Sequence, residues 1–324
     1  MSGPPKISLA EARVRAAQIL VDNNASPANA GATARALVAA EADGLAGHGL
    51  TRLASYAAQA KCGKVDGHAL PVLTQPRPAL LRVDAALGFA YPAIDLALAR
   101  LIPLAQSQGL AAASLCRSHH CGAMGLHVEA LARHGLCALM FANTPAAMAP
   151  WGGQAAIYGT NPIAFAAPVP GSDPVVIDLS LSKVARGNIV AARQKGMKIP
   201  EGWALDAAGR PTTDPDAALA GTMVPMGDAK GTALALMVEI LAACLTGAIL
   251  SKDATSFLDA KGGPPSVGQM ILAFDPAAFS GGGYDGRIGQ LVAALAADAG
   301  TRLPGARRYA HRKTAERDGL ALSF

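Results

Sequence analysis

Apolar residues recur at helical spacing over much of the chain, and short apolar runs bounded by glycine, proline and polar residues separate the periodic segments. Two helix starts carry capping signals: a capping box, SLAE at residues 8–11, and a serine before proline, Ser26–Pro27. The pattern predicts helices over residues 8–21, 27–42, 48–62, 91–107, 183–195 and 231–248, a helix that follows residue 118 and ends before Gly135, and a last helix from residue 284.

The short apolar runs predict β-strands over residues 79–85, 110–116, 136–142, 162–167, 175–179 and 268–275. Residues 202–219 are rich in turn-forming residues and should form an irregular excursion. Strands and helices do not alternate regularly, as a doubly wound parallel sheet requires, so we expect an α/β protein of another kind.

The length and composition agree with a folded protein that buries a sizeable hydrophobic core. The chain has 324 residues, of which 51% are hydrophobic, 16% charged and only 4% aromatic, so alanine and leucine do most of the packing. This composition argues against long disordered spans and suits closely packed helices in a homo-oligomer.

The net charge is +5, and the densest basic stretch is GARRYAHRKTAER at residues 305–317. Such a stretch is usually a solvated surface, and the alternative is a phosphate-binding patch, because arginine matches phosphate oxygens. Nucleic-acid binding is not expected, since no stacking aromatic residues are interleaved with the basic ones.

Five cysteines lie mostly in apolar runs, and no signal peptide is evident, so reduced thiols and a cytoplasmic protein are expected. Cys116 and Cys121 flank His119 and His120, but the spacing fits no zinc pattern and no metal is expected.

The apolar run 231–250 approaches the length of a membrane span. Glu239 would lie at its middle, where a charge is costly, and no aromatic residues flank the run. We therefore expect a buried helix there and no membrane insertion.

The segment EADGLAGHGLTRLASY, residues 41–56, spaces His48, Arg52 and Tyr56 four residues apart. On a helix that starts near His48 the three side chains share one face. The helix dipole would lower the pKa of a histidine at that N-terminus, which suits proton exchange near neutral pH. An imidazole, a guanidinium and a phenol in a row point to an anionic small molecule.

Three further polar segments are candidates for ligand contact. SHHCGAMG, residues 118–125, opens a helix whose free N–H groups could bind a phosphate, or it is a plain N-cap with surface histidines. Thr160 and Asn161 form a polar corner that either contacts a ligand or only completes a turn. Asp178, Ser180, Ser182 and Lys183 follow the end of a strand, where ligands are often held.

GGGYDG, residues 281–286, matches G-x-G-x-x-G by letter. It lies near the C-terminus, five residues separate it from the preceding strand, and no acidic residue follows about twenty residues on. We interpret it as a turn rather than a dinucleotide fingerprint.

Six ordered segments resemble the malate/L-lactate dehydrogenase family of the second type, which is unrelated to the Rossmann-fold lactate dehydrogenases. They are DGLAGHGLTRLASY, SHHCGAMGLHVEALARHGL, GTNPIAFAAP, DLSLSKVARG, IPEGWALDAAGRPTTDP and GDAKGTALALMVEILAACLTG. Members use NAD(P) on 2-oxo or 2-hydroxy acids, ureidoglycolate, sulfolactate or cyclic imino acids. Within the family, the chain looks most like the Δ1-piperideine-2-carboxylate/Δ1-pyrroline-2-carboxylate reductases.

The resemblance implies an α/β fold with a non-Rossmann NAD(P)-binding domain on a largely antiparallel sheet, a helical N-terminal and substrate-binding region, and a homodimer. The corresponding division is residues 1–120 for the helical and substrate-binding region, 121–300 for the NAD(P)-binding domain and 301–324 for a C-terminal segment that returns to the cofactor.

By position, the resemblance implies that His48 donates the proton, Arg52 binds the substrate carboxylate and Thr160 contacts the substrate; we expect Tyr56 to line the same pocket. The residues implied for cofactor contact are His120, Cys121, Gly122, Ala123, Met124, Asp178, Leu179, Ser180, Ala229, Lys230, Gly305, Arg307, Arg308 and His311. Arg307 and Arg308 would suit the extra phosphate of NADPH, with NADH as the alternative cofactor.

Two positions depart from the family pattern. Gly47 stands where a serine is usual, and Asn188 stands where imino-acid reductases have an aspartate, so both relay partners of His48 are missing. A cyclic imine tolerates this loss better than a ketone, because its basic nitrogen can be protonated before hydride arrives. We therefore expect an NADPH-dependent reductase of Δ1-pyrroline-2-carboxylate or Δ1-piperideine-2-carboxylate. The alternatives are a dehydrogenase of malate, lactate or sulfolactate, and a non-catalytic NADPH-binding protein.

Overall fold

Capped helices open the chain as the sequence predicts. The computed structural model describes residues 6–321, so the outer ends of the first and last predicted regions, residues 1–5 and 322–324, lie outside the described part. The Ser8 hydroxyl accepts a hydrogen bond from the N–H of Glu11 at 3.1 Å, and the Ser26 hydroxyl accepts one from Asn29 at 3.3 Å. Both capping predictions are confirmed.

The helices of the described part are α1 (Leu9–Val21), α2 (Pro27–Ala42), α3 (Leu53–Lys61), α4 (Ala90–Gln108), α5 (Met124–Arg133), α6 (Arg186–Gln194), α7 (Pro215–Ala220), α8 (Ala229–Glu239), α9 (Pro276–Ser280), α10 (Tyr284–Ala296) and α11 (Ala306–Asp318). The strands are β1 (Lys6–Ile7), β2 (Val72–Arg77), β3 (Leu80–Asp84), β4 (Leu110–Ser118), β5 (Cys137–Ala142), β6 (Ile163–Ala167), β7 (Val175–Leu179), β8 (Ala204–Leu205), β9 (Pro211–Thr212), β10 (Thr222–Met223), β11 (Val267–Phe274) and β12 (Leu320–Ala321).

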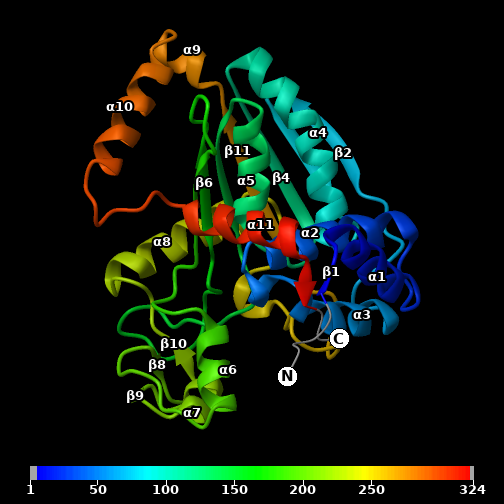
Figure 1. The fold of residues 1–324 in the computed structure, drawn as a ribbon. Coiled ribbons are helices and arrows are strands. Elements are labelled where there is room, and N and C mark those ends of the chain that lie inside the picture. The colour runs from blue at the N-terminus through cyan, green and yellow to red at the C-terminus, as the bar shows by residue number, and fades with distance from the viewer. Residues whose placement is uncertain (1–5, 322–324) are drawn as a thin grey trace.

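A seven-stranded sheet in the order β2-β3-β4-β11-β5-β6-β7 forms the centre of the molecule (Figure 1). Its neighbouring strands pair antiparallel except β3 and β4, which are parallel. The expected α/β fold with a largely antiparallel sheet is confirmed. The sheet takes strands from both sides of residue 120, so the proposed boundary between the first two regions crosses it.

Each face of the sheet has its own core, because adjacent strand residues point in opposite directions. Ile271 of β11 packs with α4 and α5 on one face, whereas its neighbour Met270 packs on the other face with residues of α6 and α8. A third core lies among α1, α2 and α3, and it includes Tyr56 and Phe89. This N-terminal core abuts the sheet near the end of β4, beside the predicted histidine loop.

Strand β2 was not predicted. Its residues, VLTQPR, include a proline and are mostly exposed, because β2 is an edge strand of the sheet. Proline is tolerated at a sheet edge, where its missing N–H is not needed for pairing.

The predicted helix over 231–248 is shorter than expected and is buried along only one face. Regular helix α8 ends at Glu239 and is followed by a π-helical turn, Ile240–Cys244. Ala235 and Val238 are fully buried, but Leu236 and Ile240 are exposed, so the predicted burial holds for one face of the helix only. Within residues 6–321 no helix is both long and apolar enough to span a membrane.

The basic stretch 305–317 forms helix α11, which the sequence pattern missed. Arg312 donates to the carboxylates of Asp43 and Glu129 at 2.7–2.9 Å, and Arg308 donates to Asp43 at 2.8–3.1 Å. Asp43 and Glu129 are both buried, and the Tyr309 ring lies 5.3 Å from the Arg312 guanidinium carbon. For these arginines the expectation of a solvated surface is wrong, since they attach α11 to α2 and α5.

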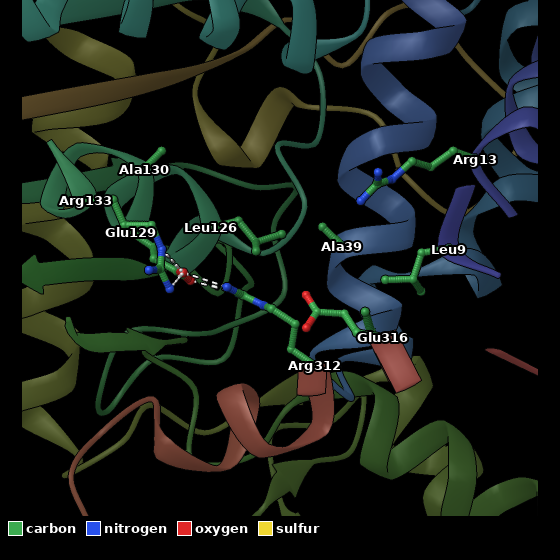
Figure 2. Close-up of a pocket in the computed structure, with 10 residues that line it drawn as sticks. Leu9, Arg13, Ala39, Leu126, Glu129, Ala130, Arg133, Arg312 and Glu316 are labelled. Atoms are coloured by element: carbon green, nitrogen blue, oxygen red, sulfur yellow. Dashed lines mark hydrogen bonds and ion pairs between the residues drawn. The ribbon is translucent and has the colours of Figure 1, made fainter. Parts of the chain in front are cut away.

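A cavity of about 280 Å³ lies beside this ion-pair network (Figure 2). Figure 2 shows Arg312 and Glu316 of α11 reaching toward Glu129 and Arg133 of α5, with Leu9 and Arg13 of α1 across the cavity. The two carboxylates of the network are nevertheless buried, whereas the Arg308 and Arg312 side chains keep 11% and 22% of their surface exposed.

Replacing Arg312 with methionine should destabilise the protein by about 3 kcal/mol, because two buried carboxylates lose a shared cation. Arg307→Met, an exposed position on the same helix, should cost less than about 0.5 kcal/mol. Urea unfolding followed by circular dichroism compares the two variants. Equal losses would contradict a structural role for the network.

Candidate active site

Two short 3-10 turns precede helix α3, and His48 is the last residue of the first turn. The turns span Ala46–His48 and Leu50–Arg52, and α3 begins at Leu53 rather than at His48 as predicted. His48 is therefore not at the N-terminus of an α-helix, and the dipole argument for its pKa does not apply.

Glu41 accounts for this irregular start. Its carboxylate accepts a hydrogen bond from the N–H of Leu50 at 2.9 Å. A Cβ atom on Gly49 would lie 3.0 Å from both the N and Cα atoms of Glu41, so the chain passes too close to α2 for any other residue. This close approach turns the chain before the helix can form.

The structure nevertheless brings the predicted side chains together. The Tyr56 hydroxyl lies 2.5 Å from Nδ1 of His120 and 3.4 Å from the Tyr91 hydroxyl, forming a buried chain of hydrogen bonds. The His48 and His120 rings stack with their centroids 5.4 Å apart and an interplanar angle of 20°. The predicted pocket residues His48 and Tyr56 thus meet on His120, which was assigned only to the cofactor.

Arg52 is the charged member of this cluster. Its Nε donates to the carbonyl oxygen of Gly47 at 2.6 Å, and within residues 6–321 it makes no ion pair with a carboxylate. Its positive charge acts on the neighbouring rings: it adds to the desolvation that lowers the pKa of His48 and His120, and it opposes the desolvation that raises the pKa of Tyr56. An arginine without an acidic partner beside uncharged groups is a site for an anion.

The imidazoles of the cluster are held in the neutral form. Desolvation, followed by the charge of Arg52, lowers the pKa of His48 to about 4. Desolvation, followed by the charges of Lys64 and Arg52, lowers the pKa of His119 to about 3, and the pKa of His120 is also well below its usual value. His119 and His120 are buried, whereas His48 keeps exposed surface in the single chain, which limits its desolvation. His48 is therefore a neutral, solvent-accessible base.

Desolvation also raises the pKa of Tyr56, so its hydroxyl keeps its proton. A neutral phenol can fix the orientation of His120 through the 2.5 Å contact without adding charge to the pocket.

The loop before α5 and the end of β7 meet as the resemblance implies. Gly122 has a φ of +68° and packs against Tyr91, Ala123 is the N-cap of α5, and Met124 is buried at its start. The carbonyl of Cys121 accepts a hydrogen bond from His127 at 2.9 Å. The Asp178 carboxylate accepts the N–H of Gly125 at 2.7 Å, so the strand end caps the helix.

Beyond Asp178, the chain leaves β7 through Leu179, which is exposed, and Ser180, whose hydroxyl lies 3.1 Å from that of Ser182. Desolvation raises the pKa of Asp178, and the Gly125 N–H and the charge of Arg308 oppose this effect.

Helix α11 reaches the same place from the C-terminus. The Arg308 guanidinium occupies the space that a Cβ atom on Gly125 would need. Its Nη1 atom is buried and has no hydrogen-bond partner in the described part. Gly305, at the start of α11, has a φ of +92°, His311 lies against Gly44, and Arg307 is exposed. Arg308 and Asp178 thus surround the N-terminus of α5, whereas Arg307 points away from the buried network.

The Thr160–Asn161 corner is held by buried polar groups. The N–H of Thr160 donates to the Thr144 hydroxyl at 2.9 Å. The Asn161 amide donates to Glu239 at 2.8 Å, and Glu239 also accepts from both the N–H and the hydroxyl of Ser251. The corner is a rigid structure, and Thr160 keeps a half-buried side chain.

Other predicted residues stay apart from the cluster. Ala229 and Lys230 begin α8 and are exposed, and Asn188 is exposed on α6. Within the described residues, no side-chain hydrogen bond joins Asn188 to His48. Gly47 contributes its carbonyl to Arg52 instead of a hydroxyl to His48.

Sequence reasoning missed several residues of the site. Tyr91 completes the phenol chain, Asp43 and Arg312 anchor the helix that carries Arg308, and Phe257 lies against the histidines. Asp43 directly follows α2, and no spacing in the sequence shows that it pairs with Arg308 and Arg312, which lie 265 and 269 positions later in the chain.

Among residues 6–321, no group of three or more His, Cys, Asp or Glu side chains is placed to hold a metal ion. Residues 281–283 of GGGYDG form the turn between α9 and α10, with Gly281 and Gly282 at positive φ, whereas Tyr284 and the two residues after it begin α10, so the interpretation as a turn holds for the first half of the motif.

Comparison with known proteins supports the family resemblance. Residues 7–323 match the family model for malate/L-lactate dehydrogenase. A (2R)-3-sulfolactate dehydrogenase (NADP(+)) from Chromohalobacter salexigens is 55% identical over 307 residues, covering 95% of this chain and 92% of the relative. A Δ1-pyrroline-2-carboxylate reductase from Ancylobacter novellus is 40% identical over 325 residues, covering 99% of this chain and 95% of the relative.

Solved structures match over nearly the whole chain as well. The crystal structure of Δ1-piperideine-2-carboxylate reductase from Pseudomonas syringae has a TM-score of 0.94 and 36% identity, covering 98% of this chain and 96% of that one. Sulfolactate dehydrogenase from Methanocaldococcus jannaschii has a TM-score of 0.90 and 27% identity, covering 98% and 93%. The predicted resemblance and the prediction of an NAD(P)-dependent oxidoreductase are confirmed.

The lowered pKa of buried His119 should make the stability of the protein depend on pH. Its pKa is about 3 when folded and about 6.5 when unfolded, so the unfolded chain binds more protons between these values. Stability should therefore fall as pH drops below about 6.5, by about 1.4 kcal/mol per pH unit for this group. Melting temperatures measured from pH 7 to pH 4 should fall less steeply for His119→Gln than for wild type. His68→Gln, at an exposed position, should keep the wild-type slope; an unchanged slope in His119→Gln would contradict the shift.

Proposed function

Because the chain belongs to the malate/L-lactate dehydrogenase family, we propose that it interconverts (2R)-3-sulfolactate and its 2-oxo acid, 3-sulfopyruvate, with NADP. The reaction class is carried by one observation: Arg52 has no carboxylate partner in the described part and adjoins the neutral imidazole of His48. The choice of substrate is supported by the 55% identity to a (2R)-3-sulfolactate dehydrogenase (NADP(+)).

Arg52 binds the carboxylate of the substrate, as an arginine fork favours. In the oxidative direction, His48 takes the proton of the 2-hydroxyl as hydride leaves C2. In reverse, protonated His48 returns that proton to the carbonyl oxygen as hydride arrives. The nicotinamide, when bound, accepts or supplies the hydride.

An anionic substrate would itself prepare the histidine. Arg52 lowers the pKa of His48 in the free protein, and a bound carboxylate would offset that charge. We therefore propose that proton uptake by His48 accompanies binding of the 2-oxo acid, which needs a proton donor, whereas His48 stays neutral when the 2-hydroxy acid is bound. This uptake would stand in for the proton relay that the family resemblance implies and that Gly47 and Asn188 do not supply.

The residues at the start of α5 fit a dinucleotide. Arg308 has a buried, unpartnered Nη1 beside Gly125, and a Cβ on Gly125 would meet the guanidinium and Asp178. The Arg308 guanidinium beside a helix N-terminus suits a phosphate group, while the N–H of Gly125 itself is held by Asp178. We propose that the loop 120–124, Asp178–Ser180, Ala229–Lys230 and Gly305–His311 hold NADP, with exposed Arg307 available to the extra phosphate.

We propose further that the sheet belongs to a non-Rossmann NAD(P)-binding domain, as the family resemblance implies, and that the protein is a homodimer. Exposed apolar side chains on α8 and its π-helical turn, among them Leu236 and Ile240, are surface that a second copy would cover.

Cyclic imino acids are the second candidate substrate. The Ancylobacter novellus reductase is 40% identical over 99% of this chain, and the Pseudomonas syringae structure has a TM-score of 0.94. A neutral His48 also suits an imine that is protonated before hydride arrives.

The test follows NADPH absorbance with purified protein and 3-sulfopyruvate, Δ1-pyrroline-2-carboxylate, Δ1-piperideine-2-carboxylate or oxaloacetate. The proposal predicts kcat/KM for 3-sulfopyruvate at least about tenfold above the others, equal to about 1.4 kcal/mol of discrimination. A preference for either imine would assign the second candidate. NADPH binding without turnover on any of them would indicate the non-catalytic alternative.

Arg52→Lys is the matched variant for this assay. It keeps the charge but loses the bidentate fork, so it should raise KM for the preferred substrate while NADPH binding stays unchanged.

A further inference from the structure

The segment 254–266, between the 3-10 turn Ser251–Asp253 and β11, has no regular secondary structure. Most of residues 258–263 are exposed, but Phe257 is buried. Its ring lies 5.0 Å from the ring of His120 and 5.3 Å from that of His119, measured between centroids. A segment without helix or sheet hydrogen bonds therefore places an aromatic ring on the histidine cluster.

Lys64 holds this segment. Its side chain is fully buried, and its Nζ donates to the carbonyl oxygens of Ser256 at 2.7 Å, Asp259 at 3.1 Å and Lys261 at 2.6 Å. An ammonium group has three N–H donors, so these carbonyls use them all. The Asp259 carboxylate, 3.7 Å away, adds charge without a hydrogen bond.

Gln59 makes the second attachment, two turns after Arg52. Its amide nitrogen donates to the carbonyl of Phe257 at 2.9 Å, and its amide oxygen lies 2.9 Å from Nε2 of His119. Since an amide oxygen only accepts, Nε2 of His119 carries the proton. Gln59 therefore fixes Phe257 and His119 relative to each other.

We propose that Lys64 is a positioning residue, which, together with Gln59, clamps residues 256–261 so that Phe257 forms a wall of the substrate pocket against His120 and its partner His48. Phe257 would then face the part of the substrate beyond C2, and Lys64 would act only through it.

The burial of Lys64 supports this role. Burying an ammonium group is costly unless it is fully hydrogen-bonded. Three carbonyl oxygens of one irregular segment accept all three hydrogen bonds from Lys64. A hydrophobic contact alone would let the segment slide. Three charge-assisted bonds to residues 256, 259 and 261 fix its path.

Lys64→Met tests the clamp in the full-length protein. Hydrogen exchange of amides 254–263 should become at least about tenfold faster, because segments with few internal hydrogen bonds open readily once their anchors are lost. Lys61→Met, at an exposed position three residues earlier, should leave exchange unchanged. Unchanged exchange in Lys64→Met would overturn the clamp.

The positioning role has a readout that does not need turnover. Water entering beside the rings, and loss of the Lys64 charge, should raise the pKa of His119, measured by NMR titration of the histidine ring protons. Phe257→Leu, which keeps every clamp bond, should produce the part of this shift that comes from the ring. Faster exchange with unchanged histidine titration in both variants would overturn the positioning role.

The kinetic part of the inference rests on the proposed function. Both variants should lower kcat/KM by about tenfold or more with the preferred substrate, as misplacement near a reacting centre does, and leave NADPH affinity unchanged. If wild type turns over none of the substrates, the proposed function fails, while exchange and titration still decide the clamp.

Discussion

The position of β11 between β4 and β5 is the constraint on which the site depends. β11 pairs with both neighbours along most of its length, and it joins strands from the N-terminal part of the chain to those that follow residue 136. Gln269 of β11 donates to the carbonyl of His119 at 3.1 Å, so the strand also holds the loop that leaves β4. The segment that leads into β11 must then pass this loop, which is why Phe257 can lie on His119 and His120.

Arginine is used in two opposite ways in this protein. Arg312 and Arg308 are committed to buried carboxylates and serve to dock α11, although Arg308 keeps one free nitrogen at the start of α5. Among residues 6–321, Arg52 donates to a carbonyl oxygen and pairs with no carboxylate, so its charge stays available. Around it the protein places neutral histidines and phenols rather than acids. The balance of charge in the pocket is therefore left for an anionic ligand to complete, and the proposed uptake of a proton on binding rests on this incomplete balance.

Much of the local structure could be predicted from the sequence, because helix caps and apolar periodicity are local signals. Ser8, Ser26 and the strands from β3 to β7 follow those signals. Helix α11 was not predicted by these local signals, because it is polar on nearly every side and is stabilised by ion pairs instead of an apolar stripe. The turn at Gly49 escaped them because its cause is contact with Glu41.

Family resemblance pointed to His48, Arg52 and the loop 120–124 as candidate site residues, but it could not show how they are supported. Lys64 meets carbonyls 192 to 197 residues away, and no spacing in the sequence encodes that contact. The four-residue spacing placed Tyr56 near His48, and in the structure its hydroxyl lies within hydrogen-bond distance of Nδ1 of His120. Long-range pairing, rather than local propensity, accounts for what the sequence left open.

Calorimetric titration of the protein–NADP(+) complex with 3-sulfopyruvate, a pair between which no hydride can pass, in two pH 7 buffers of different ionisation enthalpy, counts the protons taken up on binding. The account predicts net uptake of up to about one proton per site, since a bound anion offsets Arg52 and raises the pKa of His48. His48→Gln should bind the ligand without that uptake. Binding with no uptake in wild type, or with the same uptake in His48→Gln, would contradict it.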